Sequence, residues 1–132
     1  MKVKIPFKAE FKDRILSGRK TCTSRTKKYG EVGDTFDAFG AEFILDKVLR
    51  VNLNFVAYNF YKEEGFEAPA QFIVCWNKIH PNLWDNQLLV WVHFFRIGRP
   101  SLTSVYKTIA KKERRNTNNN MEKARAHKGN RL

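Results

Sequence analysis

The sequence predicts an α+β domain, a small and partly open β-barrel with two or three packed helices. Strand-like segments lie at both ends of the first hundred residues, helical segments lie between them, and no βαβ repeat favours a parallel sheet. Of the 132 residues, 42% are hydrophobic and 11 are Phe, which suffices for one core rich in aromatic rings.

The N-terminal part is expected to hold a strand, a helix and a basic extended segment. Residues 1–6 suit a short strand. Apolar side chains recur at helical spacing over residues 7–17, and Gly18 would end that helix. Residues 19–28 are polar and basic, which indicates an extended segment or a loop. Two glycines within residues 30–34 indicate a turn.

Three further strands are expected from alternating apolar residues. Residues 36–39 and 43–53 suit two strands around a turn at Gly40. The apolar side chains of the second strand share one face at period two. Lys47 lies on that face too, where its head group can snorkel or sit at a rim. Residues 88–97 are apolar on both faces, which predicts a central strand that is covered on both sides.

Two helices are expected between these strands. Residues 55–64 have a helical pattern that Gly65 would end, and residues 68–79 have another, with a proline in the first turn. His80 and the proline after it would close the second helix. Its packing surface is expected to consist of five side chains: Phe72, Val74, Cys75, Trp76 and Ile79.

The charge of the chain favours a polyanionic partner. The chain has 25 Lys and Arg against 13 Asp and Glu, a net charge of +12, and RNA or DNA is the first candidate. Residues 101–132 carry nine Lys or Arg against two Glu, so we expect a domain over residues 1–100 and a basic tail that is partly helical or disordered. Four of its residues are candidate nucleic-acid contacts: Lys111, Lys112, Arg114 and Arg115.

The remaining composition predicts a cytoplasmic protein without cofactor or metal. Cys22 and Cys75 are too few for a disulfide framework, and we expect free thiols in a reducing compartment. No signal peptide or run of about 20 apolar residues is seen, so no membrane partner is expected. The cysteines and histidines lack metal-ligand spacing. A monomer is favoured.

Residues 18–25, Gly-Arg-Lys-Thr-Cys-Thr-Ser-Arg, are the most informative stretch. In an extended chain, Arg19, Thr23 and Arg25 share one face, and Lys20 and Ser24 share the other. A break after the glycine could bring Lys20 and Thr23 together. Arginines and a lysine beside hydroxyls suit a phosphate or a polar base edge, whereas the alternative is a basic loop that faces solvent.

This stretch resembles the opening motif of the ASCH domain family, whose members are small barrels similar to PUA domains. The family pattern G-x-K-x-x-(E or T)-x-R is matched by Gly18, Lys20, Thr23 and Arg25. The resemblance covers about residues 3–98. Three more segments resemble the family in order: Gly33-Asp34, Glu64-Gly65-Phe66 with Phe72 and Trp76, and residues 90–94 with Arg96-Ile97.

The resemblance implies RNA or nucleoside binding in a cleft lined by the G-x-K segment, with Lys20, Thr23, Arg25 and Glu64 near one pocket. One branch of the family deacetylates 4-acetylcytidine, which implies that Thr23 is the nucleophile, Lys20 the base and Glu64 an assisting group. A lysine can accept a proton only in its neutral form, which a nearby Glu64 would oppose.

Several alternatives stay open. Glu63 is a second candidate for the site carboxylate, Arg19 a further ligand contact, and Trp84 could stack on a base, whereas Trp76 and Trp91 are expected in the core. A metal-dependent ribonuclease is a third function, although no acidic cluster suited to Mg²⁺ is seen. A protein whose basic tail docks an acidic partner is a fourth.

Overall fold

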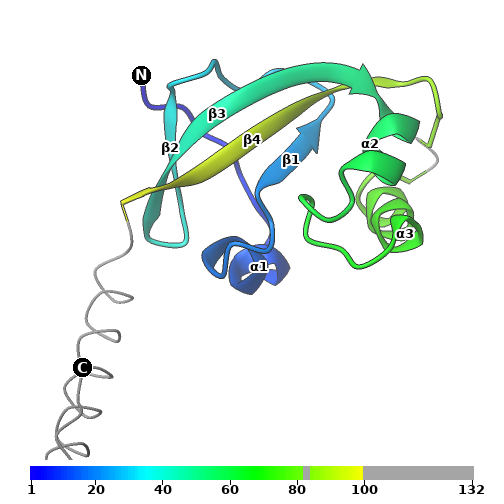
Figure 1. Cartoon of the computed structure of the whole chain (residues 1–132), viewed down its shortest axis with the longest axis horizontal. Helices are drawn as coiled ribbons and strands as arrows, with labels where there is room; N and C mark the ends of the chain where they lie inside the picture. Colours follow the sequence, from blue (N-terminus) through cyan, green and yellow to red (C-terminus); the bar gives the residue numbers. More distant parts are fainter. Residues whose placement is uncertain (82–83, 100–132) are drawn as a thin grey trace, which may run out of the picture. The chain divides into compact units, whose positions relative to one another are not determined.

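The computed structural model describes residues 1–81 and 84–99, and their core element is a four-stranded antiparallel sheet (Figure 1). The strand order is β1-β4-β3-β2, and the sheet curls into a half-barrel. The predicted α+β, partly open barrel is therefore confirmed. The strands are β1 (Cys22–Arg25), β2 (Thr35–Ala38), β3 (Ala41–Asn52) and β4 (Leu89–Arg99).

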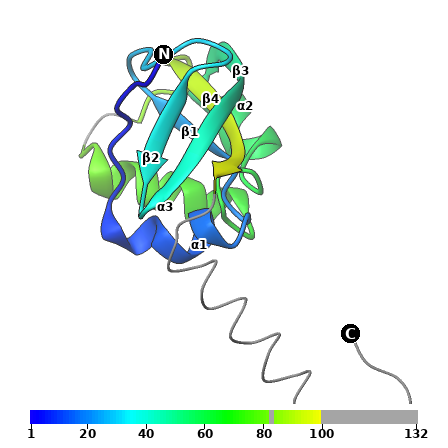
Figure 2. The ribbon, with the colours of Figure 1, turned by 90° about the vertical axis from the view of Figure 1, so that its left-hand side faces the viewer.

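The helices lie in two groups. A 3₁₀ turn η1 (Ala9–Phe11) leads into α1 (Lys12–Leu16), which lies near the start of β1. The other group is α2 (Leu53–Asn59), which directly follows β3, and α3 (Pro69–Ile79) (Figures 1 and 2). The buried apolar side chains form two cores, and α3 contacts both, because its Cys75 and Ile79 pack against the first and its Phe72 and Trp76 belong to the second.

The first of these cores, which we call the barrel core, packs α1 against β2 and β3. Its centre is aromatic: Phe36 stacks on Phe43 at 5.4 Å between ring centroids, and Phe95 meets both rings edge-on at 5.3 and 5.5 Å. Such offset and edge-on contacts add to the stability that area burial gives. Its buried members are Ile5, Phe11, Ile15, Phe36, Ala38, Ala41, Phe43, Leu45 and Phe95.

The second core, which we call the helical core, packs α2 and α3 against β1 and β4. Its buried members are Cys22, Leu53, Val56, Ala57, Phe72, Trp76, Val90 and Val92. Strand β4 serves both cores because successive side chains alternate between the faces of the sheet. Val92 belongs to the helical core and Phe95 to the barrel core, so the predicted central strand is confirmed.

A β-bulge in β3 corrects the predicted face of Lys47. Leu45 pairs with Phe95 and Lys47 pairs with Phe94, so Asp46 is an extra residue. The bulge breaks the period-two pattern, and Lys47 is exposed, with its ammonium over the Phe94 ring. Asp46 accepts from Arg96 Nε at 2.9 Å, an interaction that suits a residue outside the ladder.

Three other local predictions need correction. Residues 1–6 form a single bridge, between Lys2 and Thr35, rather than a strand. The helix expected at residues 55–64 begins at Leu53, because the Asn52 side chain caps it by accepting from Phe55 N, and it ends at Asn59. Helix α3 begins one residue later than predicted, and its Val74 is 66% exposed and does not belong to the packing surface.

The predicted basic tail, including Lys111, Lys112, Arg114 and Arg115, lies outside the described residues, and the boundary near residue 100 stays a prediction. Within residues 1–81 and 84–99, no helix has the length and apolar character needed to cross a membrane.

Candidate functional site

The motif at residues 18–25 folds as a turn that leads into β1. Gly18 ends α1 with a φ of +80°, which glycine adopts without steric cost, and Lys20 N donates to Arg14 O at 2.8 Å. The backbone N–H groups of Thr21 and Cys22 both donate to Glu63 O, at 2.7 and 3.0 Å. This junction joins β1 to the segment after α2 and fixes the start of the strand.

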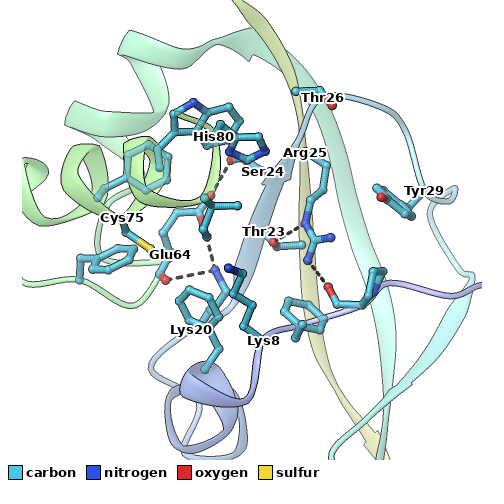
Figure 3. A pocket seen from close by; sticks show the side chains of 17 residues that line it. Lys8, Lys20, Thr23, Ser24, Arg25, Thr26, Tyr29, Glu64, Cys75 and His80 are labelled. Atoms are coloured by element: carbon cyan, nitrogen blue, oxygen red, sulfur yellow. Dashed lines mark hydrogen bonds and ion pairs between the residues drawn. The ribbon is translucent and has the colours of Figure 1, made fainter. Parts of the chain in front are cut away.

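A pocket of about 200 Å³ lies where the barrel core and the helical core meet. One wall is the edge strand β1, with Thr23, Ser24 and Arg25, and the opposite wall is α3 (Figure 3). Aromatic rings of both cores close it. The ring-bearing residues of the lining are Phe7, Phe11, Tyr29, Phe66, Phe72, Trp76 and His80.

A buried ion pair forms the floor of this pocket. Lys20 Nζ donates to Glu64 Oε1 at 2.8 Å and to Glu64 O at 3.2 Å, and the Ser24 hydroxyl donates to Glu64 Oε2 at 2.5 Å (Figure 3). Lys20 is 4% exposed and Glu64 is 3% exposed. Two charges this well removed from water are tolerated only with excellent mutual geometry and further hydrogen bonds, and both conditions are met.

The turn at Gly65 places Glu64 beside Lys20. Its φ is +97°, in the left-handed region, and a Cβ there would lie 3.2 Å from Lys20 Cβ and 3.2 Å from Arg14 Cδ. A larger residue would therefore be strained and crowded. A glycine at position 65 therefore allows the tight turn that brings the Glu64 carboxylate to the pocket.

Arg25 and Thr23 form a second polar group in the pocket. Arg25 Nε donates to Thr23 Oγ1 at 3.1 Å, and Arg25 Nη2 donates to Pro6 O at 2.5 Å. The guanidinium lies over the rings of Phe7 and Tyr29, with Cζ at 5.0 and 5.4 Å from their centroids. Burial lowers the pKa of Arg25 from its usual value. Figure 3 shows Thr23 between Arg25 and the Lys20–Glu64 ion pair.

His93 supports β1 from behind Thr23. It is fully buried, its Nε2 accepts from Tyr29 N at 3.0 Å, and its Nδ1 lies 3.2 Å from Thr23 O. Because Nε2 accepts and the carbonyl can only accept, the proton belongs on Nδ1 and the ring is neutral. Burial lowers the pKa of His93, and the nearby Arg25 charge adds to this effect.

The far wall carries polar atoms that lack partners. The His80 ring stacks on Trp76 at 4.1 Å between centroids, and burial lowers the pKa of His80. Among the described residues, Trp76 Nε1 and His80 Nδ1 are buried without a hydrogen-bond partner. Buried polar groups in folded proteins nearly always have one, so these two atoms are the unsatisfied polar atoms of the pocket walls.

The structure brings four predicted site residues to this pocket: Lys20, Thr23, Arg25 and Glu64. Between the two candidate carboxylates, Glu64 lines the pocket, whereas Glu63 supports β1 through its backbone.

Two other predicted contacts do not line it. Arg19 is exposed and donates to the Ser17 hydroxyl, and Trp84 packs against Phe72 and donates to Asn86 Oδ1.

The sequence predicted no role in the site for Ser24, His80 or His93. The signal for Ser24 was present, because period two places it on the face of Lys20. The two histidines carry no motif, and the contacts that define them come from distant segments.

Both cysteines are free, and burial raises the pKa of each thiol, so neither is a ready nucleophile. No group of three or more His, Cys, Asp or Glu suited to a metal ion occurs in the described part of the chain.

Comparisons with known proteins support the fold but not a function. No protein-family model matches the sequence, and no curated protein matches it. Among solved structures, the chain is similar to an ASCH domain from Lactobacillus crispatus, with 17% identity, a TM-score of 0.52, and 71% of this chain and 77% of that chain covered.

It is similar also to the ASCH structure from Zymomonas mobilis, with 17% identity, a TM-score of 0.53, and 75% and 69% of the two chains covered. A hypothetical protein, PH0355, aligns with 11% identity and a TM-score of 0.59 over 74% of this chain and 99% of that chain. The fold is thus that of ASCH domains, as the sequence motifs predicted.

Removing the charge of the Glu64 carboxylate should destabilise the protein, because Lys20 would stay buried without a counter-charge. We expect Glu64→Gln to lower the free energy of unfolding by about 3–5 kcal/mol, because a buried ammonium loses its counter-charge. Urea unfolding measures this, with exposed Glu67→Gln as the matched control. The double variant Lys20→Met with Glu64→Gln should recover most of the loss. An unchanged midpoint for Glu64→Gln would contradict the ion pair.

His93 should make the protein less stable in mild acid. Its pKa is lowered in the folded state, so below about pH 6.5, the value of an unperturbed histidine, the unfolded chain takes up a proton that the folded chain does not. Stability is complete above that pH and falls as pH decreases through this range. His80 acts in the same direction.

The measurement is urea unfolding between pH 7.5 and 5. We expect His93→Gln to have a smaller slope of stability against pH than the wild type, and the His80→Gln, His93→Gln double variant to have a smaller slope still. Equal slopes for all three proteins would contradict the neutral, buried state of His93.

Proposed function

We propose that the protein binds RNA, or a nucleoside derived from RNA, with the base inserted into the pocket beside Lys20, Thr23 and Glu64. The observation that carries this proposal is a pocket with aromatic walls around a small set of fixed polar groups. Single-stranded RNA is recognised by the same combination, in which unstacked bases rest on aromatic side chains and hydrogen-bond along their edges.

The pocket offers both donors and acceptors to such a base edge. Lys20 Nζ uses two of its three N–H donors on Glu64, which leaves one for an acceptor of the ligand. The Thr23 hydroxyl accepts from Arg25 and keeps its own proton to donate. Trp76 Nε1 and His80 Nδ1 still lack partners among the described residues. The N–H of Lys20, the hydroxyl of Thr23 and the N–H of Trp76 are donors that suit a pyrimidine carbonyl, whereas His80 Nδ1 donates or accepts according to the tautomer of the ring.

The net charge of +12 supports the same class of partner. The basic residues of the tail, Lys111, Lys112, Arg114 and Arg115, would add sequence-independent affinity for the phosphates of a strand, with a steep dependence on salt. The proposed division is that the pocket selects one nucleoside and the tail raises affinity for any RNA.

Titration of the full chain with cytidine and with uridine, followed by amide NMR, tests the binding proposal. We expect amide shifts confined to β1, the Glu64–Gly65 turn and the end of α3. The Thr23→Val variant loses one hydrogen bond to the ligand, so its dissociation constant should be about tenfold larger. Arg19→Gln, outside the pocket, is the matched control and should bind like the wild type. The absence of shifts with any nucleoside would rule out the proposal.

A second candidate function is hydrolysis of the acetyl amide of 4-acetylcytidine. The observation that favours it is that Lys20, Thr23 and Glu64, the three groups implied by the family resemblance, all line one pocket. No observation favours the metal-dependent ribonuclease in the same way.

The chemistry would proceed in two steps. Thr23 Oγ1 attacks the acetyl carbonyl carbon, the C–N bond to cytidine N4 breaks, and the hydroxyl proton passes through a base to the leaving amine. Water then attacks the acetyl-threonine ester, releases acetate and returns the proton to Thr23. Cytidine and acetate are the products, and no oxidant or metal is consumed.

Lys20 must lose a proton before it can act as that base. The proton would have to move along the 2.8 Å contact from Nζ to Glu64 Oε1, against the attraction that holds the ion pair together. The Ser24 hydroxyl, which donates to the other oxygen, keeps the carboxylate oriented. Glu64 would thus hold the proton of Lys20 during the first step.

Chromatography of 4-acetylcytidine incubated with the purified protein tests this candidate. We expect formation of cytidine, with turnover lowered at least a hundredfold in Thr23→Ala and in Lys20→Ala and a smaller loss in Ser24→Ala. Arg19→Gln should keep the wild-type rate. Equal turnover in wild type and Thr23→Ala would exclude the assigned nucleophile, and no turnover by folded protein would leave the binding function alone.

A further inference from the structure

The pocket carries more positive charge than its own acidic residue balances. The charged side chains that line it are Lys8, Lys20, Arg25 and Glu64. Because Glu64 is paired with Lys20, its charge is already balanced. Neither Lys8 nor Arg25 has a carboxylate within 4.0 Å among residues 1–81 and 84–99, so two cations at the pocket stay uncompensated.

Arg25 is fixed in a way that suits an anionic ligand. Both of its hydrogen bonds go to neutral acceptors, Thr23 Oγ1 and Pro6 O, and the rings of Phe7 and Tyr29 hold the guanidinium in place. A guanidinium has five N–H donors, and these two bonds use one on Nε and one on Nη2. A rigid guanidinium with spare donors matches the oxygen atoms of a phosphate.

Energetics point the same way. A cation that is half-buried without a counter-charge loses solvation that neutral acceptors restore only in part. The charges of both Arg25 and Lys8 add to burial in lowering the pKa of His80, so the fields of the two cations meet at the pocket wall. An anion placed there would compensate two charges at once.

We propose that Arg25 and Lys8 bind a phosphate group of the ligand, so the pocket takes a nucleotide in preference to a neutral nucleoside. This inference rests on the proposed nucleoside site and narrows its ligands to those that carry a phosphate. The phosphate has two possible sources, the monoester of a free nucleotide or the diester next to a base in an RNA strand. Lys8 is exposed at the pocket, where a group attached to an inserted base would reach it.

The test compares three ligands in calorimetric titrations of the full chain: cytidine, cytidine 5′-monophosphate and an oligonucleotide of six cytidines. We expect the monophosphate to bind about tenfold tighter than cytidine at low salt, as charge-assisted hydrogen bonds predict, and the gain to shrink at high salt. Arg25→Gln should remove the gain, measured as the ratio of the dissociation constants of cytidine and the monophosphate in that same variant.

Arg14→Gln is the matched control. Arg14 is another half-buried guanidinium over two rings, those of Phe11 and Phe66, but it does not line the pocket. Its variant should keep the full gain. Lys8→Gln changes an exposed side chain that makes no hydrogen bond or ion pair within the described residues, so it tests the proposal even where Arg25→Gln does not fold.

Each outcome is decisive. A gain with the monophosphate that depends on Arg25 and Lys8 supports a free nucleotide, and a gain only with the oligonucleotide that depends on both supports a strand. Cytidine binding with no gain from either phosphate form, or a gain that survives in Arg25→Gln and Lys8→Gln, overturns the inference and leaves the nucleoside site intact. If none of the three ligands binds, the nucleoside site fails as well.

Discussion

The buried ion pair between Lys20 and Glu64 is the interaction on which the rest of the site depends. It neutralises two charges that could not otherwise be buried at 4% and 3% exposure. The same carboxylate holds Ser24, so it fixes the turn before β1 and the first half of the strand. Once the ion pair fixes the start of β1 at Cys22, strand geometry sets the positions of Thr23 and Arg25, because they lie one and three residues further along the strand.

The position of the pair between two hydrophobic cores explains why a pocket exists there. The barrel core has aromatic rings surrounded by aliphatic side chains, and the helical core has aliphatic and aromatic side chains of β1, α2, α3 and β4. Phe66 packs against both, and the space that neither fills is lined by polar groups. Close packing on each side therefore leaves the junction as the place where a ligand can enter without disturbing either core.

Local sequence patterns predicted the helices and strands well wherever the apolar residues keep one spacing along the whole element. The central strand β4 and the helix α3 were found because their apolar residues keep a period of two or a helical repeat. The predicted face of Lys47 was wrong because one inserted residue, Asp46, reverses the alternation. The start of α2 was predicted two residues too late because Asn52 was not recognised as its N-cap. Lys20, Thr23 and Glu64 were found through motifs, whereas the roles of His80 and His93 arise from contacts across the fold that no spacing encodes.

The junction between β1 and the Glu63–Gly65 turn also bears on the order in which the chain folds. The hairpin of β2 and β3 pairs Ala38 with Ala41, so it closes between near neighbours, whereas the contact of Lys20 with Glu64 joins residues 44 apart. Loop closure costs more entropy for the longer connection, and contacts of large sequence separation slow folding. Closing the hairpin therefore costs less chain entropy than closing the pocket, and the pairing of β1 with β4, such as Thr23 with His93, spans a longer stretch of chain still.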